Sequence, residues 1–496
     1  MTWPVPLIPA GEGPMFQRIA RAVVDDIRRG RLVAAQRLPG SRALAEELGV
    51  HRNTVLAALG ELEAQGWIVT HRARGTFVAD SLPETPLARV PATRRAGRDG
   101  KLGFALPPEP RLMARDGNEL PRGELHLSAG VPDPRLFPVD ALARAWRRAV
   151  RRDGRRLLTY ASPEGHPALR AALAAMMRAI RGLSCTAEDV LVVRGSQMAI
   201  DLCARGLLTP GDRVAVEALG YRPSWDAMRL AGAELVPVPV DAGGIDVAAI
   251  ARAASRKPLR AVYLTSHHQY PTTVTLSPAR RLALAALARE HRLVVLEDDY
   301  DHEFHYEGRP VPPLAAADDG GNVIYLGTLS KILAPGLRLG FLIAPPPVIT
   351  RLGALRAAMD RQGDRPMEAA VAELIDDGEL ERHVRRMRTV YLARRDALVE
   401  QLRARLAGAL TFEPPRGGIS LWATVAPDID IPRWLDACGG RGIHISPGSR
   451  YTFDGSDPGA IRIVFSASTP AELDRATSVM AATLVRNRRS TRASRG

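Results

Sequence analysis

Short apolar segments alternate with Ala-, Leu- and Arg-rich helical patterns from about residue 125 onward, and this alternation constrains the fold more than any other feature. Five segments read as strands: VLVV at 190–193, RVAVEA at 213–218, AVYLTS at 261–266, LVVLE at 293–297 and NVIYLG at 322–327. Strands separated by helices predict a mostly parallel sheet flanked by helices, the α/β class. No apolar run approaches the roughly 18 residues that a membrane helix needs, so no membrane partner is expected.

The N-terminal part of the chain is built differently. MFQRIARAVVDDIRRG, SRALAEEL and HRNTVLAALGELEAQG read as three helices, with Ser41 predicted to cap the second and Gly49 to make the turn before the third. Two helices joined by a tight Gly-containing turn give the helix-turn-helix outline. Arg52, Asn53 and Thr54 are expected to be exposed at the start of the third helix, where side chains can reach base edges in the major groove.

WIVTHRARGTFVA follows as two short strands around a turn, a wing that carries Arg72 and Arg74 at its tip. Arginine at that place suits phosphates or a minor groove. A helical oligomerisation domain is the alternative, but it leaves the ordered arginines Arg42, Arg52, Arg72 and Arg74 unexplained.

Charge and composition divide the rest of the chain. The net charge of +14 permits nucleic-acid binding without requiring it. A DNA-binding domain is predicted at 12–80, a flexible basic linker at 81–124, a large domain at 125–485 and an Arg-rich tail at 486–496. Three scattered cysteines indicate neither a disulfide framework nor a zinc cluster, so no metal is expected. Without a leader-like N-terminus, the protein is expected in the cytoplasm.

Lysine is almost absent: of 68 basic residues only Lys101, Lys257 and Lys331 are lysines. Arginine stays protonated, whereas a lysine amine can deprotonate and condense with a carbonyl group. Lys101 and Lys257 are readily explained as survivors of a drift toward arginine. Lys331 is different because it follows the predicted strand NVIYLG, at the edge of the sheet where ligands of open α/β folds bind.

A second strand end supplies acids to the same edge. LVVLEDDYDHEF places Asp298 and Tyr300 directly after an apolar run. A carboxylate such as Asp298 can keep a pyridine nitrogen protonated, and the Tyr300 hydroxyl can reach the ring phenolate. Arg338, seven residues beyond Lys331, offers the bidentate fork that a phosphate prefers.

LVVRGSQMAIDL reads as a strand, a turn and a helix. Gly195, Ser196 and Gln197 would present backbone N–H groups at a helix N-terminus, which is a ready phosphate-binding cup. Each of these features is weak alone, but in this order the amine, the acid and the phosphate cup specify pyridoxal phosphate as the cofactor.

The sequence resembles two known families in tandem. LPGSRALAEELGVHRNTVLAALGELEAQGWIVTHRARGTFV is similar to the GntR-type winged helix-turn-helix, and the large domain resembles the fold-type-I aminotransferases. Four further segments also match the fold-type-I aminotransferases: SAGVPDPRLFP, TYASPEGHPALRAAL, HHQYPTTVTLSPARR and AIRIVFS. The whole resembles the MocR/GabR subfamily of transcriptional regulators. This implies a pyridoxal-phosphate-dependent transferase fold with a smaller C-terminal α+β subdomain.

The resemblance also implies residue roles. In the DNA-binding module, contacts would come from Ser41, Arg42, Arg52, Asn53, Thr54, Arg72, Arg74 and Gly75. In the large domain, Lys331 would form the internal aldimine, Tyr221 would stack on the ring, Thr328 would join Ser196, Gln197 and Arg338 on the phosphate, and Arg462 would grip a carboxylate. Tyr160 would reach the phosphate of a partner subunit in a homodimer. His268 and Gln269 would lie near the cofactor, in a motif that ends here in Thr273 where the family has Gly.

The sequence therefore predicts a transcriptional regulator that binds double-stranded operator DNA and senses an amino acid or amine through Lys331. Vestigial transaminase activity is compatible with this reading. Two alternatives stay open: a working aminotransferase that carries a DNA-binding module, and a sensor of pyridoxal phosphate itself that controls vitamin B6 synthesis. A non-PLP interaction protein is the least favoured reading.

Overall fold

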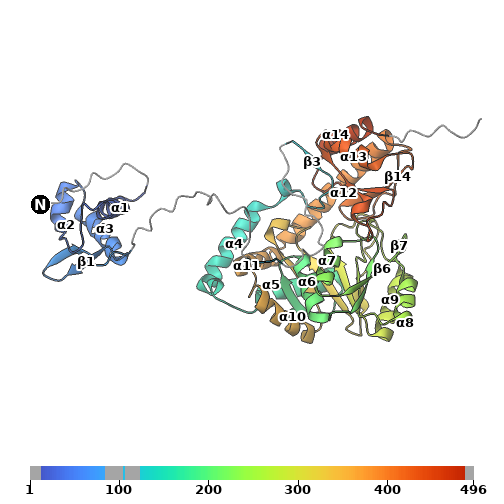
Figure 1. The fold of residues 1–496 in the computed structure, drawn as a ribbon, viewed down its shortest axis with the longest axis horizontal. Coiled ribbons are helices and arrows are strands. Elements are labelled where there is room, and N and C mark those ends of the chain that lie inside the picture. Colours follow the sequence, from blue (N-terminus) through green and yellow to red (C-terminus); the bar gives the residue numbers. More distant parts are fainter. Residues whose placement is uncertain (1–12, 84–103, 107–122, 486–496) are drawn as a thin grey trace, which may run out of the picture. The chain divides into compact units, whose positions relative to one another are not determined.

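The computed structural model describes residues 13–83, 104–106 and 123–485 (Figure 1). The chain divides into two compact units, Met1–Glu109 and Pro110–Gly496. Most of the predicted linker and the whole predicted tail 486–496 lie outside the described residues.

The N-terminal unit has the predicted three helices and wing. Its elements are α1 (Met15–Arg28), α2 (Ser41–Glu47), α3 (Arg52–Ala64), β1 (Ile68–His71) and β2 (Gly75–Val78). The two strands pair antiparallel, with His71 opposite Gly75 at the tip. Val55, Ala58 and Leu62, one turn apart on α3, are fully buried and form a core with residues of α1, α2 and the wing. This unit thus has a hydrophobic core of its own.

The residue that caps α2 differs from the predicted one, and α3 has a capping residue that was not predicted. Ser41 does not cap α2: Gly40 is the capping residue, in extended conformation, and Ser41 is the first residue of the helix. Its hydroxyl is used elsewhere, because it accepts a hydrogen bond from Nε of Arg52 at 3.3 Å. The cap of α3 is His51, whose Nδ1 accepts a hydrogen bond from the backbone N–H of Asn53 at 3.2 Å. The imidazole of His51 thus accepts the capping hydrogen bond that a Ser or Asp side chain usually accepts at this position.

The large unit is built on a seven-stranded sheet with the order β4-β12-β11-β10-β9-β5-β6. Only β12 runs antiparallel to its neighbours, so the sheet is mostly parallel as predicted. Its strands are β4 (Val190–Val193), β5 (Arg213–Glu217), β6 (Glu234–Val238), β9 (Ala261–Leu264), β10 (Val294–Asp299), β11 (Val323–Thr328) and β12 (Gly340–Ile343). The five apolar segments of the sequence are all strands of this sheet.

Helices cover both faces of the sheet. One face packs against α6 (Ser196–Leu207), α7 (Arg222–Leu230) and α10 (Pro346–Met359), in a cluster that includes Ile200, Trp225 and Leu352. The opposite face receives α5 (Pro167–Arg181), α8 (Val247–Arg256) and α9 (Pro278–His291). Alternate residues of a strand point to opposite faces, so Leu296 and Val295 of β10 belong to different clusters.

A smaller α+β subdomain follows the sheet, as predicted. Its four-stranded sheet has the order β13-β14-β17-β16, with β13 (Leu410–Thr411), β14 (Ser420–Val425), β16 (Ser446–Pro447) and β17 (Ala460–Val464). Two helices accompany this sheet, α13 (Ile431–Gly439) and α14 (Pro470–Ala482). The remaining elements are α4 (Val139–Asp153), α11 (Arg365–Asp376) and the short strands β3 (Leu125–His126), β7 (Val240–Asp241), β8 (Gly244–Ile245) and β15 (Ile443–His444).

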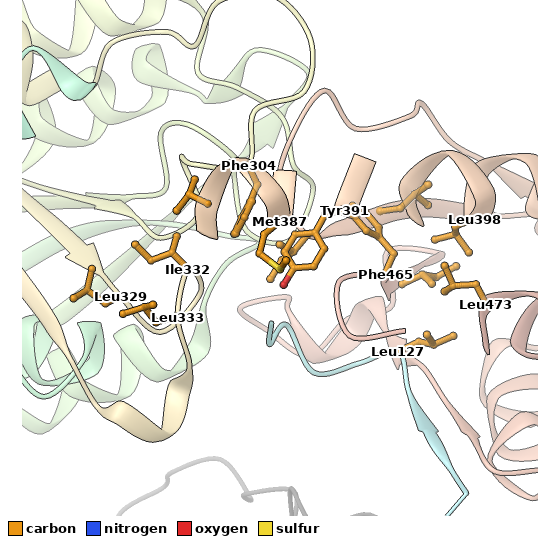
Figure 2. Packing of buried hydrophobic residues seen from close by; sticks show 14 of the residues in the cluster. Leu127, Phe304, Leu329, Ile332, Leu333, Met387, Tyr391, Leu398, Phe465 and Leu473 are labelled. Atoms are coloured by element: carbon orange, nitrogen blue, oxygen red, sulfur yellow. The ribbon is translucent and has the colours of Figure 1, made fainter. Parts of the chain in front are cut away.

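A 27-residue helix, α12 (Glu379–Arg405), joins the two parts of the large unit. Met387, Tyr391 and Leu398 of α12 lie in one hydrophobic cluster that also holds Leu329 and Leu333 from the segment after β11 and Phe465 and Leu473 from the subdomain (Figure 2). Lys331 therefore stands in a segment whose apolar neighbours are anchored in the core. None of the described helices is both long and apolar enough to span a bilayer.

Candidate functional site

A recess lies where β10, the segment after β11 and the subdomain meet, with about 520 Å³ of empty space when its opening to solvent is counted. Six of the predicted residues line it: Ser196, Tyr221, Asp298, Tyr300, Lys331 and Arg462. They come from five separate stretches of sequence. The fold thus brings together the amine, the acid, two aromatic side chains, the helix N-terminus and the buried arginine.

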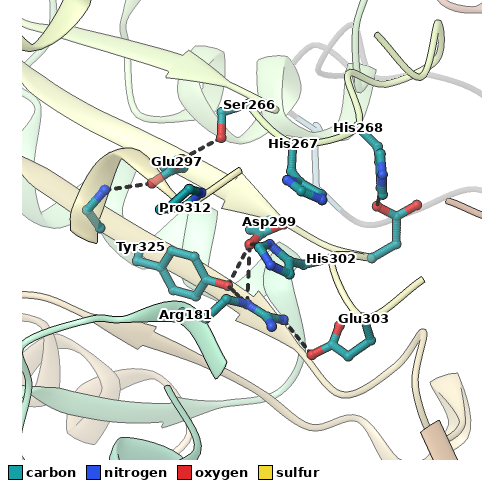
Figure 3. A network of polar contacts seen from close by, with 12 residues as sticks. Arg181, Ser266, His267, His268, Glu297, Asp299, His302, Glu303, Pro312 and Tyr325 are labelled. Atoms are coloured by element: carbon teal, nitrogen blue, oxygen red, sulfur yellow. Dashed lines mark hydrogen bonds and ion pairs between the residues drawn. The ribbon is translucent and has the colours of Figure 1, made fainter. Parts of the chain in front are cut away.

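Three successive acids end β10, and only the middle one, Asp298, lines the recess. Glu297 accepts hydrogen bonds from Ser266 and from the backbone of Leu314, the latter at 2.8 Å. Asp299 accepts from Tyr325 at 2.8 Å, and its Oδ2 lies 2.9 Å from Nδ1 of His302 (Figure 3). These two point to the face of the sheet opposite the cavity.

Asp298 points into the cavity instead. Its Oδ2 accepts a hydrogen bond from the Tyr263 hydroxyl at 2.7 Å, while Oδ1 is buried without a hydrogen-bond partner among the described residues. Burial raises the pKa of Asp298 to about 7, against the lowering effect of the Tyr263 bond. A buried carboxylate oxygen with no donor fits a ligand that brings its own N–H group.

The charge of Asp298 should carry a measurable cost to stability when no ligand is bound. Between about pH 4 and pH 7 the unfolded chain loses this proton while the folded protein keeps it, so stability falls with rising pH through that window and is constant above it. For protein stripped of small molecules, Asp298→Asn is expected to raise the free energy of unfolding at pH 8 by at least about 1 kcal/mol. Denaturant unfolding at pH 5 and pH 8 measures this.

Asp241→Asn is the control, because Asp241 is exposed and ion-paired with Arg280 at 2.7 Å. It should give no gain at either pH. If Asp298→Asn destabilised the protein equally at both pH values, the ionised carboxylate of Asp298 would not cost the folded state free energy.

Lys331 faces Asp298 across the cavity and donates a hydrogen bond from Nζ to the carbonyl oxygen of Gly130 at 2.5 Å. Burial, and next the charge of Arg462, lower the pKa of Lys331 to about 8, although Asp301 and Asp298 act to raise it. A lysine with such a pKa has a substantial neutral fraction near neutral pH, which a nucleophilic amine requires.

The predicted phosphate cup lies at the N-terminus of α6. Gly195 caps the helix with a φ of +81°, a conformation that favours glycine. A Cβ atom on Gly195 would lie 3.3 Å from the guanidinium of Arg338, so the arginine packs close beside the cup. Arg338 also donates to the carbonyl oxygen of Arg194 at 2.7 Å. Backbone N–H groups, the Ser196 hydroxyl and a guanidinium thus converge on one place.

Seven predicted residues are not among those that line the cavity: Gly195 and Arg338 of the phosphate cup, and five others. Thr328 accepts a bond from the N–H of Ser330, and Gln197 donates to the carbonyl oxygen of Pro223 at 2.9 Å. His268 lies 2.7 Å from Asp301, and Gln269 donates to the carbonyl oxygens of Leu219 and Tyr270, so both shape the loop behind the cavity. Tyr160 is 79% exposed, with its ring near Arg361. The departure from the family motif, Thr273, adopts a φ of +65°.

Arg462 is 1% exposed on β17 and has no acid as an ion-pair partner in the described part of the chain. Nη1 donates to the carbonyl oxygen of Ser128 at 3.3 Å, and the guanidinium lies 4.8 Å from the ring centre of Tyr270. Nε has no hydrogen-bond partner among the described residues. Burial lowers the pKa of Arg462, but nearby phenols, first that of Tyr270, raise it above its usual value. A buried cation without a counter-charge fits an anionic ligand.

Sequence reasoning missed other residues of the cavity. Gly130, Thr265, Tyr270 and Ile419 line it, and Tyr263 holds Asp298. Gly130 and Tyr270 stood in the quoted segments SAGVPDPRLFP and HHQYPTTVTLSPARR and could have been named; Thr265, Ile419 and Tyr263 carry no local signal.

The predicted DNA-contacting residues lie together on the N-terminal unit. Arg42, Arg52, Asn53, Arg72 and Arg74 are exposed, whereas Ser41, Thr54 and Gly75 are half-buried. Arg37, which was not predicted, lies beside the wing: a Cβ atom on Gly75 would be 3.0 Å from its Nε.

Two family models match the chain. Residues 16–78 match "Bacterial regulatory proteins, gntR family", and residues 123–480 match "Aminotransferase class I and II". The probable rhizopine catabolism regulatory protein MocR of Rhizobium meliloti is 33% identical over 443 residues, which cover 89% of this chain and 87% of that relative. The chain belongs to the MocR-type transcriptional regulators.

Another MocR-type relative and a solved structure are similarly close. The HTH-type pyridoxine biosynthesis transcriptional regulator PdxR of Corynebacterium glutamicum is 31% identical over 76% of each chain. The α-aminoadipate aminotransferase LysN of Thermus thermophilus, complexed with N-(5'-phosphopyridoxyl)-L-leucine, has a TM-score of 0.68 and 28% identity over 73% of this chain and 92% of its own. This MocR-type chain therefore joins a DNA-binding gntR domain to the fold of a pyridoxal-phosphate-dependent enzyme family.

Proposed function

We propose that this MocR-type regulator binds pyridoxal phosphate through Lys331 and binds an amino acid or amine effector in the same cavity. The observation that carries the proposal is that Lys331, Asp298 and Arg462 line one recess, in which Arg462 has no acid partner among the described residues. The recess then offers an amine, an acid and a cation to a single ligand.

The residues present fit the cofactor. Asp298 would hold the pyridine nitrogen with its unpartnered Oδ1, Tyr300 would bind the phenolate oxygen, and Tyr221 would cover the ring. The N-terminus of α6 with Ser196 and Arg338 would hold the phosphate. When bound, pyridoxal phosphate supplies an aldehyde that condenses with amines and a ring that accepts electrons.

The chemical class of the effector can be inferred from the groups of the recess that the cofactor would not contact. Arg462 presents a guanidinium fork that suits a carboxylate, and Tyr270 closes the wall beside it. A molecule with an amino group and an acid group would use both the aldehyde held at Lys331 and the guanidinium of Arg462. We therefore propose an α- or ω-amino acid as the effector, with turnover slow or absent.

Coupling to DNA is the regulatory part of the proposal. Effector binding would favour one conformation of the large unit and thereby change how the gntR domains fit their operator. A homodimer is proposed, because the exposed Tyr160 would act on a cofactor only from a second copy of the chain. We also propose that the protein works in the cytoplasm, because that is where its operator DNA would be.

One experiment separates the candidate functions. Operator binding is measured without additions, with pyridoxal phosphate, and with pyridoxal phosphate plus a panel of amino acids and amines, and the same samples are analysed for keto acids. An amino-acid-dependent change in affinity without product supports the proposal. With a second keto acid added to accept the amino group, several equivalents of keto acid product per chain would support a working aminotransferase. A response to pyridoxal phosphate alone would support the role named for the pyridoxine biosynthesis regulator.

DNA contacts should fall into two measurable classes. Arg42→Ala is expected to weaken binding to all sequences and to reduce the slope of log affinity against log salt by about one unit, since it removes one phosphate contact. Asn53→Ala is expected to cost roughly 1–3 kcal/mol on the operator and to relax specificity at one base pair. Fluorescence anisotropy at several salt concentrations measures both.

Arg21→Ala is the matched control, because Arg21 is exposed on α1, away from the recognition helix in the sequence. It should leave both the operator affinity and the salt slope unchanged. Equal affinities for wild type, Arg42→Ala and Asn53→Ala would make the N-terminal unit a protein-interaction domain.

A further inference from the structure

Three histidines from two loops meet beside the cavity. His267 and His268 lie beyond β9, and His305 lies beyond β10. One ring nitrogen of each lies within 4.8 Å of the others, and the rings of His267 and His268 are 4.3 Å apart. His267 and His268 are buried, each 3% exposed, while His305 is half-buried and both of its ring nitrogens are out of solvent.

These histidine rings make fewer hydrogen bonds than is expected of buried histidines whose only role is packing. Neither ring nitrogen of His267 has a hydrogen-bond partner among the described residues. Leaving a buried polar group unpaired costs about 1–3 kcal/mol, so a hydrophobic side chain would serve better as simple packing. His267 also stacks on His302 at 4.1 Å, which fixes its ring plane (Figure 3).

The ring of His268 is oriented in the way that metal-binding histidines are oriented. Its Nδ1 lies 2.7 Å from Oδ1 of Asp301, a bond that leaves Nε2 with a free lone pair. A carboxylate on the second nitrogen is the usual support of a histidine ligand.

We propose that His267, His268 and His305 form a binding site for a divalent first-row transition-metal ion, with Zn²⁺ the best fit. Three imidazoles with an open fourth position are a known zinc arrangement, and imidazole is a preferred ligand for this class of ion. Zinc–nitrogen bonds of about 2.0–2.1 Å in tetrahedral geometry need nitrogens about 3.4 Å apart, so binding of the ion would draw the three rings closer together. The site is independent of the cofactor and of the proposed function.

The position of the site gives the ion a means to act on the cavity. His268 is two residues before Tyr270 and His305 is five residues after Tyr300, and both tyrosines line the recess. The backbone at His305 pairs with Gly417, next to the segment that carries Ile419 into the recess. A Cβ atom on Gly417 would collide with Nε2 of His268, so glycine is required there. The ion would tie these three wall segments together.

The test uses full-length protein without a histidine tag, first treated with chelator and then titrated with Co²⁺ and Zn²⁺. Wild type is expected to bind one ion per chain, with the visible absorption bands of tetrahedral Co²⁺, and Zn²⁺ should displace Co²⁺ with loss of those bands. Anomalous X-ray scattering at the zinc edge would place the ion between the three rings.

Variants separate this site from incidental binding. His305→Ala removes a half-buried ring and is expected to weaken Co²⁺ binding at least about 100-fold, while Asp301→Asn should weaken it about 10–100-fold by releasing the support of His268. His126→Ala is the matched control, because His126 also stands beside another histidine, His444, at 4.8 Å. It should bind as wild type does, and circular dichroism checks that each variant folds.

Absence of tetrahedral Co²⁺ bands from wild type, or equal affinity for wild type and His305→Ala, would overturn the proposal. An ion found at His126 and His444 instead would do the same.

Discussion

Replacing Lys331 with alanine is expected to abolish covalent retention of pyridoxal phosphate and, with it, the yellow colour of the purified protein. Lys331 is the only lysine among the described residues that line the recess, and its amine is buried with a pKa lowered to about 8. Gel filtration followed by absorption spectroscopy measures the retained cofactor. The loss should be essentially complete, since non-covalent contacts alone exchange during filtration.

Lys257→Ala is a matched control, because Lys257 is exposed and pairs with Glu234 at 2.9 Å. It should retain the cofactor as wild type does. Borohydride reduction and peptide mapping of wild type should place the pyridoxyl group on Lys331. A label on Lys257 or Lys101 would refute the assignment.

Arg462→Ala is expected to leave cofactor loading intact. It should weaken the binding of amino acids, followed by absorption, by at least about 2 kcal/mol, or roughly 30-fold in apparent affinity. The reason is the burial of this guanidinium without an acid partner among the described residues, which leaves it available to a carboxylate. Titration of absorption with a panel of amino acids gives the affinities.

Two comparisons sharpen this result. Arg462→Lys keeps the charge but loses the fork, so its affinity should fall between those of wild type and Arg462→Ala. An amine that lacks the acid group should bind wild type and Arg462→Ala alike. If Arg462→Ala responded to amino acids as wild type does, the effector would be an acid-free amine or pyridoxal phosphate itself.

Local pattern was enough to predict the sheet and part of the site. The run VLVV is strand β4, and its burial on both faces explains why all four residues are apolar. Asp298 could be predicted because an acid directly after an apolar strand has few structural uses. Its neighbours Glu297 and Asp299 obey the same pattern, and only the structure shows that they bond to other side chains and backbone groups and do not line the recess.

The rest of the site depends on which strands are neighbours. Tyr263 reads as one apolar residue within AVYL, and its hydroxyl reaches Asp298 only because β9 pairs with β10. Gly130 enters the recess from a segment 201 residues before Lys331. The histidine cluster was missed for the same reason, since His268 and His305 lie in separate loops and meet in space alone. Ser41 was assigned wrongly because Gly40 adopts the extended cap conformation equally well.

The separate hydrophobic cores have a consequence for heat denaturation. The core around Val55 and Leu62 is confined to the N-terminal unit, whereas the cluster along α12 runs from Leu329 to Leu473 without a break. Calorimetry should therefore show two endotherms with distinct ligand dependence. Operator DNA would move the small endotherm and pyridoxal phosphate the large one, because each ligand stabilises only the unit that binds it. An effector that moved both would report, as a thermal shift, the free energy by which the regulator couples its two halves.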